Sequence, residues 1–536
     1  MDAVRWWTAW DGADVAMDET TKSSDITLAD LLGAFSLATD LGLGQPMSHL
    51  LRAWQIAVRL EDRLRVSVDR PALFYVAMLA WVGCVADAPE VAANFGDDIA
   101  FRADSYDVDL GGMAALAFFL SHAGAGGSLG HRARSMSALL ASGGNRVAQG
   151  IQGHCLVTSV LAEDLGLGTE IATALRQFFA RWDGQGVPRR LGGTEVALPV
   201  RIFHLADVVE VYDRRGGVPA AVREAQRRRG RQFDPEIVDV FCTSADDILH
   251  EVPDVYDGSG RIVAEPHLLV TLSNGELDHA LTALADFTDL RCPTRAGHSR
   301  RVSELAVAAA RHLRVSPEET TTLGRAGLVH DIGLHGVPAN ILMKETALSA
   351  SEQERLRAGS YYTERVLARP PALARIGAIA SLAHERMDGT GHHRGLQGSA
   401  IPLTGRVLAA ACAFAELVAP RMEGPGLKMK EAAQRLRAEA TAGRLDPAAA
   451  DAVLAAAGVG TRRPTAGPAG LTAREVEVLL LIARGAATRD VAHQLGIAHK
   501  TAGTHIERIY TKTGSHSRST ATIFALKNGL LDPLDL

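Results

Sequence analysis

The sequence predicts an all-α protein in which one helical domain occurs twice and a small four-helix module follows it. Alanine, leucine, arginine and glycine dominate the composition, whereas aromatic residues make up only 5%, and this balance favours helices over sheets. Nearly every long segment has helical periodicity; VSELAVAAARHL, for example, places Val302, Leu305, Ala309 and Leu313 on one face. Alternation typical of strands is rare, and residues 261–273 are its best example.

An internal repeat is the second observation behind this prediction. Residues 181–207 (RWDGQGVPRRLGGTEVALPVRIFHLAD) align without a gap with residues 386–412 (RMDGTGHHRGLQGSAIPLTGRVLAAAC). Two shorter pairs align upstream: MLAWVGC (78–84) with LVHDIGL (328–334), and SHLLRA (48–53) with GHSRRV (297–302). The first copy carries a longer insert between its second and third segments. Self-similarity of this kind predicts a duplicated helical domain.

The order of the expected elements follows from the repeat and from composition. The N-terminal stretch lacks the basic region and apolar run of a signal peptide, so we expect a flexible extension. A segment rich in glycine and proline before the last module is typical of a linker. The predicted units are an extension (1–26), a first repeat with its insert (27–245), a connector (246–280), a second repeat (281–457), a linker (458–470) and the C-terminal module (471–536).

Length, charge and cysteine content limit the possible classes of protein. A chain of 536 residues predicts three or four domains of roughly 150 residues each. The net charge is −6, so any nucleic-acid surface must be local. The five cysteines form no C-x-x-C pair, which argues against a zinc knuckle or a disulfide framework and fits a reducing cytoplasm. No apolar run reaches the ~18 residues that span a bilayer, so no membrane partner is expected.

The C-terminal module has the charge and pattern of a DNA-binding unit. Residues 471–531 contain eight basic and four acidic residues, a net charge of +4 on an acidic chain. Two short helices separated by LGIAHK would set the second, TAGTHIERIYTK, in a major groove. A hydroxyl and free N–H groups near the start of that helix can bind phosphate. The expected DNA face comprises Lys500, Thr501, Thr504, His505, Arg508 and Lys512, and the expected core comprises Val491, Leu495, Ile506 and Ile509.

Residues 471–531 also resemble the LuxR-type helix-turn-helix module over its whole length. The shared features are the LTxREXEVL pattern at the start, the GAATRDVA helix, KT before the recognition helix and KTG after it. Ala502 stands where the family often has valine. The resemblance implies a transcription regulator. Because one module contacts few base pairs, we expect a homodimer on a pseudo-palindromic operator in double-stranded DNA.

The second repeat contains His330-Asp331, an adjacent pair that can turn toward one metal ion. GHSRRV, LVHDIG, AHERMDGTGHHRGL and IPLTGRVLAAAC occur in the order found in HD-domain phosphohydrolases of the HD-GYP branch, which residues 281–457 resemble. That branch holds two or three metal ions, usually iron or manganese, in a helical bundle and hydrolyses cyclic di-GMP. The resemblance implies His298, His330, Asp331 and His384 as metal ligands, with iron, manganese or zinc as the divalent metal.

Several positions depart from the ligand set that this resemblance implies. Thr294 replaces a glutamate, Leu334 a lysine, Gly359-Ser360 a His-Pro pair, Ala383 a histidine and Cys412 the closing aspartate. A thiolate at Cys412 could coordinate a softer ion such as zinc, and His392-His393 could offer replacement imidazoles. Alternatively, His298, His330 and His384 are buried histidines satisfied by hydrogen bonds. The missing ligands predict a pseudoenzyme without catalytic residues.

The first repeat departs from the pattern differently. Ala80-Trp81 occupies the His-Asp position and Phe178-Phe179 the paired-histidine position, so aromatic rings are expected to fill the former metal cavity. His49, His154 and Asp207 remain, and the two histidines are expected to be ordinary core residues. A composite site shared by the repeats is a further alternative, which the separation of the two pockets disfavours.

Three functions are compatible with these patterns. The first is a cytoplasmic transcription regulator whose degenerate HD tandem senses an unknown small-molecule effector or mediates dimerisation. The segment SLATDLGLGQPMSH, the two repeats and the LuxR-type module together resemble an actinobacterial group of HD-domain regulators. The second is a metal-dependent phosphohydrolase of cyclic dinucleotides or nucleotides with a regulatory DNA-binding domain. The third is a protein–protein scaffold, which the intact module disfavours. The ligand count favours the first.

Overall fold

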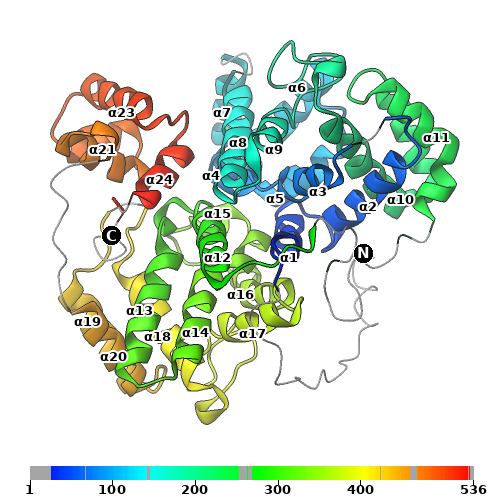
Figure 1. Ribbon diagram of the computed structural model, residues 1–536. Helices are drawn as coiled ribbons and strands as arrows, with labels where there is room; N and C mark the ends of the chain where they lie inside the picture. The colour runs from blue at the N-terminus through cyan, green and yellow to red at the C-terminus, as the bar shows by residue number, and fades with distance from the viewer. Residues whose placement is uncertain are drawn as a thin grey trace.

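The computed structural model describes residues 26–66, 68–141, 145–250, 252, 262, 268–422, 424–458, 468–528 and 530–531. Within these ranges the protein consists of helices and their connections (Figure 1), and β-structure is limited to isolated bridges. The all-α prediction is confirmed. The predicted extension (1–26) and linker (458–470) lie largely outside the described residues. So does much of the strand candidate 261–273, from which Thr271 forms a single bridge with Thr27.

The helices fall into three groups along the chain. The first group is α1 (Leu28–Gly42), α2 (His49–Glu61), α3 (Arg70–Leu79), α4 (Cys84–Phe95), α5 (Asp98–Ser105), α6 (Gly112–His122), α7 (Leu129–Ala141), α8 (Asn145–Asp164), α9 (Gly168–Arg176), α10 (Leu198–Arg228) and α11 (Pro235–Leu249). The second is α12 (Asn274–Asp289), α13 (His298–His312), α14 (Pro317–Val329), α15 (Ala339–Leu342), α16 (Ala350–Val366), α17 (Pro371–Ala380), α18 (Leu403–Val418), α19 (Met429–Thr441) and α20 (Pro447–Ala457). The third is α21 (Ala473–Ala483), α22 (Thr488–Gln494), α23 (His499–Thr513) and α24 (Arg518–Lys527).

The first helix of each repeat begins in the same way. Thr27 caps α1 and Ser273 caps α12, and in both cases an acidic residue three positions later completes a capping box. Since α12 begins at Asn274, it starts inside the range expected to be a connector.

The next helix of each repeat begins at the aligned histidine. His49 is the first residue of α2 and His298 the first of α13, and the residue before each adopts a left-handed conformation, with φ of 81° at Ser48 and 74° at Gly297. A buried aspartate lies nine positions before each histidine. It accepts a hydrogen bond from the backbone N–H of the residue that follows that histidine. The two bonds are Leu50 N to Asp40 Oδ1 (3.1 Å) and Ser299 N to Asp289 Oδ2 (2.9 Å). This shared geometry supports the duplication.

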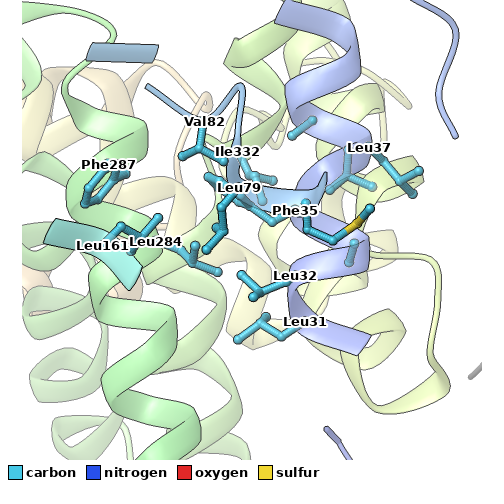
Figure 2. Packing of buried hydrophobic residues seen from close by; sticks show 14 of the residues in the cluster. Leu31, Leu32, Phe35, Leu37, Leu79, Val82, Leu161, Leu284, Phe287 and Ile332 are labelled. Carbon is cyan, nitrogen blue, oxygen red and sulfur yellow. The ribbon is translucent and has the colours of Figure 1, made fainter. Parts of the chain in front are cut away.

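The two repeats share one hydrophobic core. Leu32 and Phe35 on α1, Leu79 on α3 and Leu284 on α12 belong to the same buried cluster (Figure 2), which also includes Ile332 of the second repeat. Burial of apolar side chains between the repeats joins them into one body.

An ion-pair network ties the insert of the first repeat to the second repeat. Asp98, which begins α5, is buried and accepts hydrogen bonds from Arg102 (2.7 Å), Arg291 (3.0 Å) and the backbone N–H of Ala339 (2.7 Å). Although burial favours the protonated acid, the two guanidinium groups lower the pKa of Asp98. A buried carboxylate with this many donors fixes the position of α5.

One stretch of the chain, Arg70–Phe95, is long and apolar enough to cross a membrane, although none was expected from the sequence. In the structure, 78% of its most apolar window is buried inside the protein. It comprises α3 and α4, which pack in the core.

The C-terminal module has its own core and also contacts the first repeat. Its helices enclose a separate apolar cluster that includes Val478, Val491 and Ile509. Ile523 on α24 instead belongs to the main core. Lys527 pairs with Asp164 of α8 at 2.7 Å, and Figure 1 shows α24 beside α8. A side chain on Gly485 would collide with Pro293 of the second repeat, so the module is docked on both repeats.

Candidate metal and DNA-binding sites

The second repeat brings its aligned histidines and aspartate together. His298 begins α13, His330 and Asp331 follow the last turn of α14, and Cys412 lies on α18. The Nε2 or Nδ1 atoms of His298 and His330 and the sulfur of Cys412 all lie within 4.8 Å of one another. Asp331 Oδ2 lies 3.8 Å from His298 Nε2 and 3.4 Å from His330 Nε2. His384 Nε2 lies 3.8 Å from Asp331 Oδ1, so all four predicted ligands meet here.

A hydrogen bond orients the ring of His330. Its Nδ1 lies 2.8 Å from the carbonyl oxygen of Gly327, and a carbonyl can only accept, so Nδ1 carries the proton. Burial lowers the pKa of His330, which keeps the ring neutral. The lone pair on Nε2 therefore faces Asp331 and Cys412. Histidine ligands of metals in proteins are held by this kind of second hydrogen bond.

Two buried polar atoms in this cluster have no hydrogen-bond partner among the described residues: His298 Nε2 and Asp331 Oδ1. Leaving a buried polar atom unpaired costs about 1–3 kcal/mol, so native proteins rarely leave such atoms without a ligand. Both atoms face the other candidate ligands. The donor set, with two imidazoles, one carboxylate and one thiol, fits a divalent ion such as zinc or iron.

The protonation states of the cluster largely suit metal binding. Burial, together with Arg295, holds the pKa of His298 well below its usual value. Although burial favours the acid form, Arg295 and His330 hold the pKa of Asp331 well below its usual range. Burial raises the pKa of the Cys412 thiol well above its usual value. The imidazoles and carboxylate are therefore ready to coordinate, whereas Cys412 must lose a proton.

Arg295 and Glu416 complete the charges around this cluster. Arg295 donates a hydrogen bond to Asp331 and lies 3.8 Å from Glu416 Oε1. Glu416 follows Cys412 by one helical turn, and the two could share a metal ion with His384. Sequence reasoning missed both residues, although the i, i+4 spacing of Cys412 and Glu416 places them on one face of α18.

Three residues of this cluster, His330, Asp331 and His384, line a cavity of about 380 Å³. Lys344 and Arg386 add positive charge to the cavity wall, and Lys344 also pairs with Glu352 at 2.7 Å. The ring of His392 stacks on His384 with centroids 5.1 Å apart and planes 7° from parallel. His393 turns to Glu364 at 3.0 Å, so of the two extra histidines only His392 lines the cavity. The substituted positions Thr294, Leu334, Gly359 and Ser360 also line it.

In the first repeat, the equivalent histidine is fully paired. His49 Nδ1 bonds to Glu210 at 2.5 Å, and its Nε2 lies 2.9 Å from Asp207. Burial would lower the pKa of His49, but these two carboxylates raise it to about 10. His49 is therefore a charged core residue and has no lone pair for a metal. His154 is likewise buried, with Nε2 2.8 Å from the carbonyl oxygen of Ala80.

The aromatic residues of the first repeat do not fill the former metal cavity, contrary to the expectation from the sequence. Trp81 and Phe179 line two cavities of about 170 Å³ each. The Trp81 indole N–H donates a hydrogen bond to Asp207 Oδ2 at 3.3 Å. This bond holds the indole ring beside Asp207, and both residues line the second of these cavities. Trp81 and Phe179 pack edge to face, with centroids 5.5 Å apart at 89°, and the two cavities lie beside this pair.

The predicted DNA face lies on α23. Lys500, Thr501, Thr504 and Arg508 are exposed, and His505 is half-buried. Lys512 is at the same surface but donates hydrogen bonds to Glu475 (2.7 Å) and to the carbonyl oxygen of Gly470 (3.0 Å). The four expected core residues are buried or half-buried, and Ala502 is buried. The C-terminal module contacts the first repeat through α24. These contacts leave the predicted DNA face of α23 exposed to solvent.

Comparisons with known proteins match two domain families to this chain. The HD domain family matches residues 282–449, and the family of bacterial regulatory proteins named luxR matches residues 469–525. A 3'3'-cGAMP-specific phosphodiesterase 3 of Vibrio cholerae is 29% identical over 406 residues, covering 74% of this chain and 87% of that protein. A 3'3'-cGAMP-specific phosphodiesterase 1 of the same organism is 33% identical over 174 residues, covering 32% of this chain but only 40% of that protein.

A crystal structure of a cyclic GMP-AMP-specific phosphodiesterase from V. cholerae has the same fold. It superposes with a TM-score of 0.56 at 25% identity and covers 81% of this chain and 98% of that chain. Coverage of this extent reaches beyond the second repeat and the C-terminal module into the first repeat.

These similarities correct the expectation of a pseudoenzyme. The HD domain resembles phosphodiesterases in sequence and in structure, which points to a phosphohydrolase. Counting substituted motif positions one by one overlooked the groups that surround the cluster, such as Glu416. The chain therefore contains an HD domain within residues 282–449 and, within residues 469–525, a DNA-binding domain of the bacterial luxR regulatory family.

Proposed function

We propose that this protein is a transcription regulator whose second repeat is a metal-dependent phosphodiesterase of cyclic dinucleotides. The observation that carries the proposal is the cluster of His298, His330, Asp331 and Cys412, in which two buried ligand atoms lack a hydrogen-bond partner among the described residues. Two members of the cluster, His330 and Asp331, line a cavity of about 380 Å³. A buried imidazole nitrogen and a buried carboxylate oxygen that both lack a hydrogen-bond partner among the described residues are explained by an ion that both coordinate.

The chemistry of the cavity supports a phosphodiester substrate. A divalent ion bound here would polarise a phosphoryl oxygen and lower the pKa of a bound water. Arg295, Lys344 and Arg386 supply positive charge beside the ligand cluster, and guanidinium and ammonium groups bind phosphate oxygens. His392, stacked on His384, offers a flat surface near the same point. The named activity of the V. cholerae relatives supports cyclic GMP-AMP as the first substrate to test.

The C-terminal domain is the second half of the proposal. We infer that Lys500, Thr501, Thr504, His505 and Arg508 contact double-stranded DNA and that Lys512, held by Glu475, flanks this surface. Two copies of the chain on a pseudo-palindromic operator would supply the contact area that one small module lacks. Such a regulator acts in the cytoplasm, where both DNA and cyclic dinucleotides are found.

Turnover by purified full-length protein tests the proposal. Protein reconstituted with iron, manganese or zinc should convert cyclic GMP-AMP, cyclic di-GMP or cyclic di-AMP to a linear dinucleotide, separated by chromatography. Removal of the metal with a chelator should abolish turnover, and returning the ion should restore it. Absence of product with all three metals and all three substrates would refute the phosphodiesterase.

A further inference from the structure

The diverged pocket of the first repeat has exchanged metal ligands for aromatic rings. Trp81 stands at the position of Asp331 and Phe179 at the position of His384, according to the aligned segments. Two adjoining cavities of about 170 Å³ each lie here and share six lining residues, among them Trp81, Phe119, Ile151 and Phe179. The duplication has thus kept a pocket and changed the chemistry of its walls.

The insert of the first repeat covers this pocket. Phe101 on α5 and Phe119 on α6 contribute rings with centroids 6.1 Å apart, and Ala138 on α7 contributes a methyl group. None of the residues of α7 is fully buried, so this helix covers the cavity without being locked into the core. The second repeat has no equivalent insert between its aligned segments.

Three polar groups at one end of the pocket, Asp87, Arg102 and His154, are already paired with one another, whereas Glu90 lies at an exposed position of the wall. Asp87 accepts hydrogen bonds from Arg102 (2.5 Å) and lies 3.4 Å from His154 Nδ1. His154 Nε2 lies 2.8 Å from the Ala80 carbonyl oxygen. A charged ligand would have to break these buried pairs, which is costly. The apolar rings, in contrast, are exposed to the cavity and favour an uncharged planar molecule.

We propose that this pocket binds a planar, uncharged aromatic molecule of one or two rings. A buried apolar cavity of about 150 Å³ is enough to bind benzene in another protein, and each of the two cavities here measures about 170 Å³. The rings of Trp81 and Phe179, which line both cavities, would pack against such a ligand. This site is separate from the metal cluster, and the proposal does not rest on phosphodiesterase activity.

One helix connects this pocket to the DNA-binding domain. Ile151 and His154 of α8 line the pocket, while Gly153 on the same helix lies against Ser517 of the C-terminal domain. At the end of α8, Asp164 pairs with Lys527. A ligand that shifts α8 therefore acts on the surface that holds the DNA-binding domain.

Fluorine NMR with 6-fluoroindole as the probe tests the site in the full-length protein. Binding to wild type should broaden the probe resonance, whereas the anion 4-fluorobenzoate should show no broadening. Ala138→Phe, which fills the cavity, should weaken binding by about tenfold or more, equivalent to about 1.4 kcal/mol. The matched control is Ala133→Phe, an exposed position on the same helix, which should bind like wild type.

A second variant keeps the test decisive if Ala138→Phe is unstable. Phe119→Ala removes one ring from a half-buried position shared by both cavities and should also weaken binding. No broadening with wild type, or equal loss in Ala133→Phe and Ala138→Phe, would overturn the site. Stronger binding of 4-fluorobenzoate than of 6-fluoroindole would contradict the proposal that the ligand is uncharged. Bound 6-fluoroindole should also change the rate at which trypsin cuts residues 458–470, and an unchanged rate would contradict the link through α8.

Discussion

His330 Nε2 lies 3.8 Å from the buried sulfur of Cys412, and His330 itself lines the cavity of the second repeat. In the first repeat the aligned position holds Asp207, which bonds to His49 at 2.9 Å. A thiol therefore takes the place of a carboxylate beside the ligand cluster. Sulfur ligands favour softer ions, whereas carboxylates suit harder ions such as manganese. This exchange bears directly on which metal the protein holds.

Replacing the thiol should change the preference among metals. Cys412→Asp should raise affinity for manganese relative to zinc by about tenfold or more, measured by competition between the two ions for full-length protein. Cys242→Asp is the matched control, because Cys242 lies on α11 away from the cluster, and it should keep the wild-type preference. An identical preference in wild type and Cys412→Asp would show that the sulfur does not coordinate the ion.

The charged core of the first repeat predicts a pH dependence of stability. The pKa of His49 is raised from 6.5 to about 10 by Asp207 and Glu210, against the effect of burial. The stabilisation of the folded state by charged His49 is therefore complete below pH 6.5. It declines as pH rises above that value and is lost above about pH 10. Urea unfolding of wild type should show this fall in the free energy of unfolding.

Removing His49 should abolish that pH dependence. His49→Met leaves buried Asp207 without its cation, whereas Glu210 keeps Arg52 and Arg214, and it should cost about 3 kcal/mol near neutral pH. His131→Met, at an exposed position on α7, should unfold like wild type. A His49→Met protein that keeps both the stability and the alkaline decline of wild type would contradict the assigned ion pairs.

The exposed cations of α23 should control the salt dependence of DNA binding. Lys500→Ala combined with Arg508→Ala removes two positive charges from the exposed face, so the slope of log affinity against log salt should fall by about 2. Fluorescence anisotropy with a labelled duplex measures this slope. Lys527→Ala removes a cation that pairs with Asp164 instead and should leave the slope unchanged. An unchanged slope in the double variant would refute the DNA face.

Docking of the C-terminal domain predicts how the linker responds to protease. Ile523 on α24 is buried in the main core rather than in the core of its own domain, so Ile523→Glu should release the domain without unfolding it. Trypsin should then cut residues 458–470 faster and yield a folded C-terminal fragment. Asn528→Glu, at an exposed position, is the control. Equal cleavage rates in wild type and Ile523→Glu would show that α24 does not hold the domain.

Local patterns in the sequence were sufficient for much of the fold and for part of the site. The repeat and the helical periodicity predicted both helical units, and the aligned motifs placed His298, His330, Asp331 and His384 in one cluster. Glu416 shares a face of α18 with Cys412, but its approach to Arg295, and that of Arg295 to Asp331, depends on tertiary packing, so the aligned motifs did not reveal either residue. The open aromatic pocket was also missed, because residue identity alone does not show whether packed rings leave a cavity beside them.

Phosphodiester turnover by two single-histidine variants tests the central claim most directly. His298 and His312 are the first and last residues of α13, one buried in the ligand cluster and the other exposed. With cyclic GMP-AMP and the metal that best supports wild-type turnover, His298→Gln should lower kcat/KM by about 100-fold, and His312→Gln should match wild type. Turnover by His298→Gln equal to that of His312→Gln would contradict a catalytic metal site in the second repeat.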